Sequence, residues 1–134
     1  MRWFESSRPS RVRASHEPAA VLVTSLATVL ACFERGDVTD ALPAFSEHCV
    51  YREPGKEPVI GRTALAAHWN AFVASGVRWR FFVDGIIAEG RRACVIYRFG
   101  VARGEADAWR ERAGCAVVQF DAHDTIEEWR EYDG

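Results

Sequence analysis

The chain has 134 residues, of which 49% are hydrophobic and 27% are charged, a balance typical of one globular domain. Its formal net charge of −2 gives no electrostatic support for nucleic-acid binding. The sequence contains no glycine-rich dinucleotide motif, no phosphate-binding loop and no nucleophile elbow, so any chemistry is expected to be cofactor-free acid–base work.

Residues 1–16 contain several arginines and little apolar content, so we expect a flexible, solvated tail. In the next segment, 19–33, leucines and valines recur at helical spacing between polar residues. This one-sided pattern argues against a signal peptide, and the segment is shorter than the ~20 residues that span a bilayer. We therefore predict a single domain over 17–134 and no membrane contact.

Three helices are predicted in the first part of the chain. The first spans about 17–35, because Gly36 supplies a stop signal. A second, shorter helix follows an aspartate cap and runs through Phe45. The third spans about 63–74 and has a clear apolar face. That face consists of Leu65, His68, Trp69, Phe72 and Val73.

The rest of the chain is rich in strand-forming residues with period-two alternation. The predicted strands cover residues 49–53, 79–88, 93–102, 109–120 and 125–132. Three helices followed by a meander of four long strands indicate the α+β class. The helices are expected to pack on one face of an antiparallel sheet.

The predicted strand at 93–102 has two faces of different character. Val95, Tyr97, Phe99 and Val101 share an apolar face, and Arg98 lies on the other. If the apolar face lies beneath the helices, Arg98 is a solvated surface residue. If the other face does, the apolar face needs a second chain to cover it. Because long charged side chains are seldom buried, the residues alone favour the first arrangement.

The chain ends with EEWREYDG, which is expected to form the last strand. In a regular strand, Glu127, Trp129 and Glu131 share one face, and Ile126 and Glu128 look the other way. Neither face is plainly apolar, so periodicity leaves open which of them is buried.

This layout and the closing IEEWREY resemble the nuclear transport factor 2-like superfamily, in particular SnoaL-like proteins and limonene epoxide hydrolases. The similarity covers nearly the whole chain after residue 17. It includes the helix ending in GD, the VYRE strand, the GR that opens the third helix and the final I-x-x-W-R-acid-Y. The resemblance implies a cystatin-like cone, in which a strongly bent sheet wraps the helices around an internal pocket.

The resemblance also implies which way the strand at 93–102 faces. It turns Arg98 into the pocket, so that Val95, Tyr97, Phe99 and Val101 face outward to a homodimer partner. This orientation is opposite to the one that the residues alone favour. The acid and the tryptophan of the last strand, Glu131 and Trp129, are then expected to face inward.

In limonene epoxide hydrolases an arginine lies between two aspartates, and a tyrosine and an asparagine help to hold the attacking water. By motif, Tyr51, Arg98 and Glu131 match the tyrosine, the arginine and one aspartate. Glu53 stands at the asparagine position and Gly100 at the other aspartate, so the triad is incomplete. The resemblance therefore implies an acid–arginine–acid cluster, with Glu131 as proton carrier, Arg98 as its charge partner, and Tyr51 and Glu53 as supporting groups.

The pocket itself is expected to be shaped by Phe45, His68, Trp69, Phe72 and Trp129. An apolar pocket raises the pKa of a carboxyl group and an adjacent arginine lowers it, and the sequence does not rank the two effects. The expected function is a cofactor-independent isomerase, cyclase or epoxide-hydrolase-like enzyme acting on a small, mostly apolar ligand. The alternative is a non-catalytic binding or scaffold module, because an arginine between two glutamates can be a static ion-pair network.

The four cysteines lack CxxC spacing and the histidines are scattered, so no metal site is expected. Unpaired cysteines favour a reducing, cytoplasmic location. Neither nucleic acid nor a membrane is expected as a partner.

Overall fold

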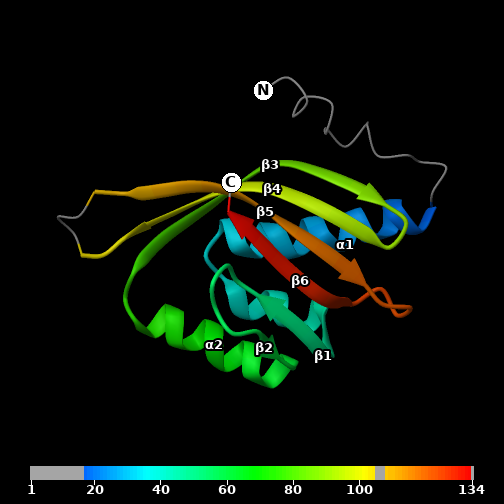
Figure 1. Cartoon of the computed structure of the whole chain (residues 1–134), viewed down its shortest axis with the longest axis horizontal. Helices are drawn as coiled ribbons and strands as arrows, with labels where there is room; N and C mark the ends of the chain where they lie inside the picture. The colour runs from blue at the N-terminus through cyan, green and yellow to red at the C-terminus, as the bar shows by residue number, and fades with distance from the viewer. Residues whose placement is uncertain (1–16, 105–107, 134) are drawn as a thin grey trace.

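The fold is built from two α-helices, one 3₁₀-helix and six strands, within residues 17–104 and 108–133, which the computed structural model describes. The predicted tail at 1–16 lies outside these residues. The helical segments are α1 (Glu17–Glu34), η3 (Val38–Ala44) and α2 (Arg62–Ala74). The strands are β1 (Phe45–Arg52), β2 (Val59–Ile60), β3 (Arg78–Glu89), β4 (Arg92–Ala102), β5 (Arg110–Phe120) and β6 (Ile126–Asp133). The predicted α+β class is confirmed (Figure 1).

The six strands form one sheet in the order β2-β1-β6-β5-β4-β3. Neighbouring strands are antiparallel except β1 and β6, which run parallel. The expectation of a purely antiparallel sheet is therefore wrong for β1 and β6. The chain between them includes α2 and three long strands, and this long connection allows β1 to pair in parallel with the last strand. The short strand β2, which the sequence did not predict, pairs with β1 at the sheet edge.

The predicted second helix is a 3₁₀-helix that ends at Ala44, not at Phe45. Pro43 lies inside it and has no backbone N–H, which disfavours a longer regular α-helix. Phe45 instead begins β1, with a fully buried side chain. Gly36 adopts a positive φ of 83° immediately after α1, a conformation that glycine adopts without strain. None of the described helices is long and apolar enough to cross a membrane.

Register shifts interrupt the alternation in β6, in β3 and in β1, where the pairing with β6 shifts between Phe45 and Val50. In β6 the pairing passes from Ile126 to Glu128, which leaves Glu127 as the extra residue. As a result Ile126 and Trp129 are both buried, with exposed fractions of 0% and 1%. The face expected for Ile126 is therefore wrong, because a bulge shifts every residue before it to the other face. In β3 the extra residue is Asp84.

An aromatic cluster joins the helices to the centre of the sheet. Phe33 of α1 meets the ring of Trp69 of α2 edge to face, with 5.6 Å between centroids, and meets Trp129 of β6 at the same distance. Phe45 of β1 lies 5.4 Å from Trp69 in the same arrangement. Because buried aromatic rings remove large areas from water, this cluster fixes α1 and α2 against β1 and β6.

The apolar face of β4 points toward the helices. Val95 and Tyr97 are buried, with exposed fractions of 0% and 6%, and Phe99 packs against the core beside them. Val101 continues the same face. The expectation that these four residues face outward to a dimer partner is therefore wrong. Turning this face inward buries apolar area and leaves Arg98 on the outside, where it finds charged partners.

Candidate functional site

A cavity of about 400 Å³ lies between the helices and the inner face of the sheet. Aromatic side chains from α1, α2, β1, β3 and β4 form much of its wall. These aromatic residues are Phe33, Tyr51, Trp69, Phe72, Trp79, Phe81, Tyr97 and Phe99. A mostly apolar cavity of this volume is typical of a site for a small organic molecule.

Glu131 reaches this cavity from β6 and is held by two hydrogen-bond donors. The indole Nε1 of Trp129 donates to Glu131 Oε2 over 3.0 Å, and the hydroxyl of Tyr51 donates to the same oxygen over 3.1 Å. Tyr51 and Trp129 stand opposite each other in the parallel β1–β6 ladder, which brings both donors to one place. No described residue donates to the other oxygen, Oε1, so the carboxyl group is fixed through one atom and open at the other.

Burial raises the pKa of Glu131 above its ordinary value. The hydrogen bond from Trp129 opposes this rise, the nearby charge of Glu53 adds to it, and Tyr51 and Arg112 oppose it more weakly. Burial is the largest influence, so the acid is shifted toward the pH range in which a carboxyl group exchanges protons with substrates. The sequence had left this outcome open because it set burial against Arg98.

Glu53 lines the same cavity but is paired differently from the expectation. Its carboxylate lies 3.0 Å from Nε2 of His68 and 3.6 Å from Nζ of Lys56. The ring of His68 stands beside that of Tyr51, with centroids 5.9 Å apart. Two glutamates, Glu53 and Glu131, therefore flank Tyr51. The partner of Glu53 is His68, where the resemblance implied Arg98.

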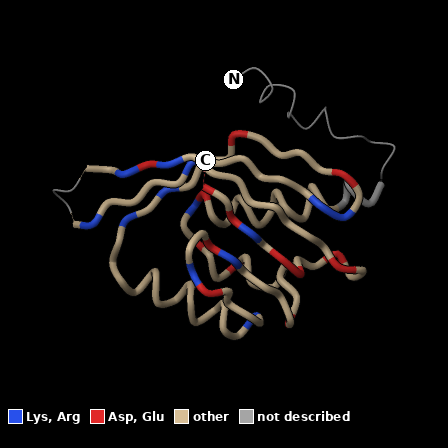
Figure 2. Tube along the Cα trace, in the orientation of Figure 1, with Lys and Arg blue, Asp and Glu red and all other residues tan. Residues whose placement is uncertain are grey.

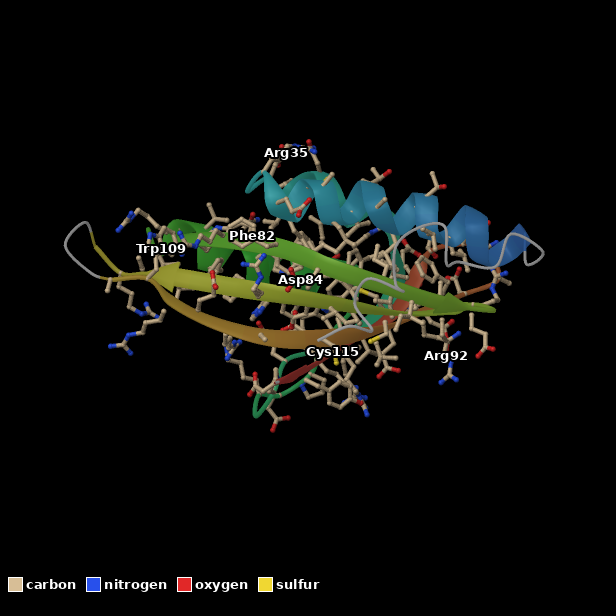
Figure 3. All side chains as sticks on the ribbon, turned by 90° about the horizontal axis from the view of Figure 1, so that it is seen from above. Arg35, Phe82, Asp84, Arg92, Trp109 and Cys115 are labelled. Atoms are coloured by element: carbon tan, nitrogen blue, oxygen red, sulfur yellow. The ribbon has the colours of Figure 1, made fainter. Side chains whose placement is uncertain are left out.

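Arg98 lies on the opposite face of the sheet from Glu131. Its Nε donates to Asp84 Oδ2 over 3.0 Å and its second guanidinium nitrogen to Oδ1 over 3.1 Å. The guanidinium also lies 3.9 Å from Glu111 and stacks over the ring of Phe82, 4.9 Å from its centroid. Figure 3 labels two of these partners, Phe82 and Asp84, which both belong to β3. The expectation that Arg98 is the charge partner of Glu131 is therefore wrong. The bulge at Asp84 provides a carboxylate on the outer face, where the arginine stays partly hydrated.

Gly100, which replaces the second family aspartate, belongs to the same outer face. A Cβ at this position would lie 3.3 Å from both Cγ and Nε of Arg80, whose side chain crosses the glycine. A carboxylate here would approach Arg80 and not the cavity. The acid–arginine–acid cluster implied by the resemblance is therefore not assembled in the cavity.

Tyr97 is a cavity residue that the family resemblance placed on the outer face, whereas the residues alone favoured the inner face. Its ring stacks on Phe81 with centroids 5.0 Å apart, and no described residue forms a hydrogen bond with its hydroxyl. Gly114 leaves room for that hydroxyl, because a Cβ there would lie 3.2 Å from it. Burial and the neighbouring Glu131 raise the pKa of Tyr97, so the hydroxyl keeps its proton. The inward alternation of Val95 and Tyr97 was the signal that could have identified it.

The remaining predicted pocket residues fall into two groups. His68, Trp69 and Phe72 line the cavity. Phe45 and Trp129 lie behind its wall, where their rings pack at 6.2 Å between centroids. Within residues 17–104 and 108–133, no group of three histidine, cysteine or acidic side chains is placed to hold a metal ion.

The chain matches the family model described as SnoaL-like domain over residues 26–129. Among solved structures it resembles an LEH-like epoxide hydrolase from M. tuberculosis, with a TM-score of 0.72, 18% identity, and coverage of 84% of this chain and 82% of that one. A protein from a soil-derived mobile gene cassette gives a TM-score of 0.74 and 20% identity, with 86% and 90% of the two chains covered.

A putative polyketide cyclase from Xanthomonas campestris pv. campestris gives a TM-score of 0.67 and 21% identity, with 89% and 92% coverage. At these identities the likeness to solved structures shows the fold. No curated protein sequence matches the chain significantly. Because the family model spans most of its length, the chain belongs to the SnoaL-like domain family.

Proposed function

We propose that the protein is a cofactor-independent acid–base enzyme in which Glu131 moves a proton on a small, mostly apolar ligand. One observation carries the proposal: the Glu131 carboxyl is anchored at Oε2 by Trp129 and Tyr51, while Oε1 is left without a donor at the cavity. An anchored carboxyl group in apolar surroundings has both the geometry and the raised pKa of a general base or acid.

The reaction class that suits these groups is proton abstraction beside a carbonyl. Glu131 Oε1 takes the proton as the C–H bond breaks, and the electron pair moves onto the carbonyl oxygen to form an enolate. The protonated hydroxyl of Tyr97 is placed to donate to that oxygen. Glu131 then returns the proton to another carbon of the conjugated enolate, which completes an isomerisation. Alternatively the enolate carbon attacks a second carbonyl of the ligand, and Glu131 returns the proton to the alkoxide that forms, which completes a cyclisation. Tyr51 acts as a positioning residue through its bond to Glu131.

The comparisons support this class of chemistry in a general way. The names of two similar structures, an epoxide hydrolase and a putative polyketide cyclase, refer to small-molecule enzymes. Arg98 lies outside the cavity and an acid, Glu53, replaces the water-holding amide. We therefore favour isomerisation or cyclisation over epoxide opening.

The test is hydrogen–deuterium exchange at the α-carbon of 1-tetralone in D₂O, followed by NMR. The wild-type protein is expected to accelerate this exchange and Glu131→Gln to abolish the acceleration. Glu128→Gln is the matched control, since Glu128 belongs to the same strand but pairs with Arg52, 2.9 Å away, on the outer face. Undiminished exchange in Glu131→Gln, or no acceleration by the wild-type protein, contradicts the proposal.

The competing proposal is a binding module that uses the same cavity without chemistry. Its support is the aromatic wall, in which Phe72 lies 5.9 Å from Trp79 and 6.4 Å from Phe99 between ring centroids. This proposal predicts tight ligand binding with no exchange in either the wild-type protein or Glu131→Gln.

We also propose a homodimer through the outer face of the sheet, with contact residues that differ from those expected. Support comes from large apolar side chains that this face exposes: Phe82 at 38%, Ile87 at 45% and Tyr132 at 44%. Light scattering at micromolar concentration is expected to give the mass of two chains. A strict monomer overturns the proposal.

A further inference from the structure

One side of the cavity carries basic residues, in contrast to its aromatic walls. In the β4–β5 ladder Arg110 pairs with Val101 and Arg112 pairs with Phe99. Directly paired residues project to the same face of a sheet, so both arginines belong to the inner, cavity-lining face. Both line the cavity and both are exposed, which places them at its opening. Figure 2 shows basic segments gathered where β4 ends and β5 begins.

The charge of these arginines is largely available for a ligand. Arg110 forms no ion pair with any described residue, and Arg112 has only a 3.5 Å contact with Asp133. Both side chains of that contact are more than half exposed, at 58% and 57%, so water weakens it. Glu111 lies between the two arginines in sequence and also borders the cavity. Its carboxylate pairs with Arg80, 3.6 Å away, and Arg98, 3.9 Å away, and forms no ion pair with Arg110 or Arg112.

The basic opening and the proposed proton carrier are connected by apolar surface. Phe99 is the β4 neighbour of Arg112, and its ring lies 6.4 Å from Phe72 and 6.2 Å from Trp79. Arg112 is also near enough to lower the pKa of Glu131. The cavity thus presents cations at the opening, aromatic rings along its wall and a carboxyl group deeper inside.

We infer that the ligand of this cavity is an aromatic or alicyclic carboxylate. Its anion binds Arg110 and Arg112, and its ring lies along the aromatic wall with the reacting carbon toward Glu131. A guanidinium presents paired N–H donors that match a carboxylate. Binding the anion at the opening also keeps it away from the charge on Glu131. This inference rests on the proposed function for the direction of the ligand, but its binding test is independent of turnover.

The experiment compares two probes of the same shape by calorimetry in low-salt buffer: 2-naphthylacetate and the neutral 2-naphthylacetamide. The wild-type protein is expected to bind the anion roughly tenfold more tightly than the amide, as charge-assisted bonds to guanidinium allow. Arg110→Gln and Arg112→Gln each reduce the anion's affinity several-fold and leave the amide's unchanged. Arg92→Gln, at the exposed β3–β4 turn, is the matched control and changes neither.

Three results overturn the inference: equal wild-type affinity for both probes, no binding of the anion at millimolar concentration, or an equal loss of both probes in the arginine variants. Glu131→Gln separates this test from that of the proposed function. If Glu131→Gln abolishes exchange but the wild-type protein shows no preference for the anion, the inference fails and the enzyme proposal stands. If the preference is present but exchange survives in Glu131→Gln, the anion site stands and the enzyme proposal fails.

Discussion

Tyr51 and Trp129 lie side by side on neighbouring parallel strands, with their ring planes nearly parallel at 17° and 6.4 Å between centroids. Each donates a hydrogen bond to Glu131 Oε2. The three residues form one unit, in which two aromatic side chains supply apolar burial and polar anchoring of the same carboxyl group. This combination sets the expected behaviour of the protein with pH.

The unfolding free energy of Glu131→Gln, relative to that of the wild-type protein, is expected to increase as pH rises. Burial raises the pKa of Glu131 in the folded state, so its contribution to stability is complete below the unfolded pKa of about 4.3 and is lost as pH increases through the folded pKa. Glutamine does not titrate and retains an oxygen for the two donors. Urea unfolding at several pH values between about 4 and about 8 measures the difference in unfolding free energy between the two proteins. A constant difference over this range contradicts the assignment.

Tyr51→Phe removes one of the two donors to Glu131 and keeps the ring. Loss of a buried hydrogen bond is expected to cost about 1 kcal/mol of unfolding free energy. Since the donor lowers the pKa of Glu131, its loss raises that pKa, and the pH at which the base becomes active moves upward. The pH profile of ketone exchange checks this shift. An unchanged profile shows that Tyr51 does not tune the acid.

Tyr97→Phe is the partner experiment, because this hydroxyl forms no hydrogen bond with any described residue. Stability is expected to change little, whereas exchange falls by roughly 100-fold if the hydroxyl stabilises the enolate. Comparing Tyr51→Phe with Tyr97→Phe separates the positioning role from the direct role. Exchange at the wild-type rate in Tyr97→Phe excludes the enolate contact.

Gly114→Ala is expected to destabilise the protein and to displace Tyr97. The added Cβ would lie 2.8 Å from the carbonyl oxygen of Tyr132 and 3.2 Å from the Tyr97 hydroxyl. Such crowding costs roughly 1–3 kcal/mol, measured by chemical denaturation. Gly100→Ala is the matched control, since its Cβ would approach the movable side chain of Arg80 and the ring of Trp109. Equal losses in the two variants contradict this account.

Arg98→Gln is expected to leave ketone exchange unchanged and to cost less than about 1 kcal/mol. The guanidinium is 44% exposed and pairs with Asp84 on the outer face, away from Glu131. Exchange rates and denaturation measured on the same preparation check both parts. A large loss of exchange in a folded variant shows that the outer face contributes to the chemistry.

The sequence predicted the class of the fold and the order of its main elements, because helical and strand periodicities are local properties. It also indicated, from Val95 to Val101, that the apolar face of β4 is buried. The family resemblance gave the opposite orientation, and the residues alone were the better guide. A match of YRFG to a motif identifies a position in the alignment, but it does not show which side of the strand Arg98 occupies.

The features that escaped prediction depend on pairing between distant strands. The bulge at Glu127 decides that Ile126 and Trp129 share the buried side, and no local signal in EEWREYDG marks it. The partners of Glu131 likewise follow from the β1–β6 pairing, and His68 reaches Glu53 from the helix α2. In the sequence, Arg110 and Arg112 belong to an ordinary run of charged residues. The register of β5 with Phe99 and Val101 of β4 shows that they face the cavity.

The parallel pairing of β1 with β6 also has a kinetic consequence. Tyr51 and Glu131 are 80 positions apart in the sequence, and closing so long a loop is slow compared with forming a helix or a hairpin. The carboxyl group acquires its shifted acidity only when this closure is complete. Refolding followed by tryptophan fluorescence and by recovery of ligand binding is therefore expected to show a single shared rate, because the site forms only when β1 pairs with β6.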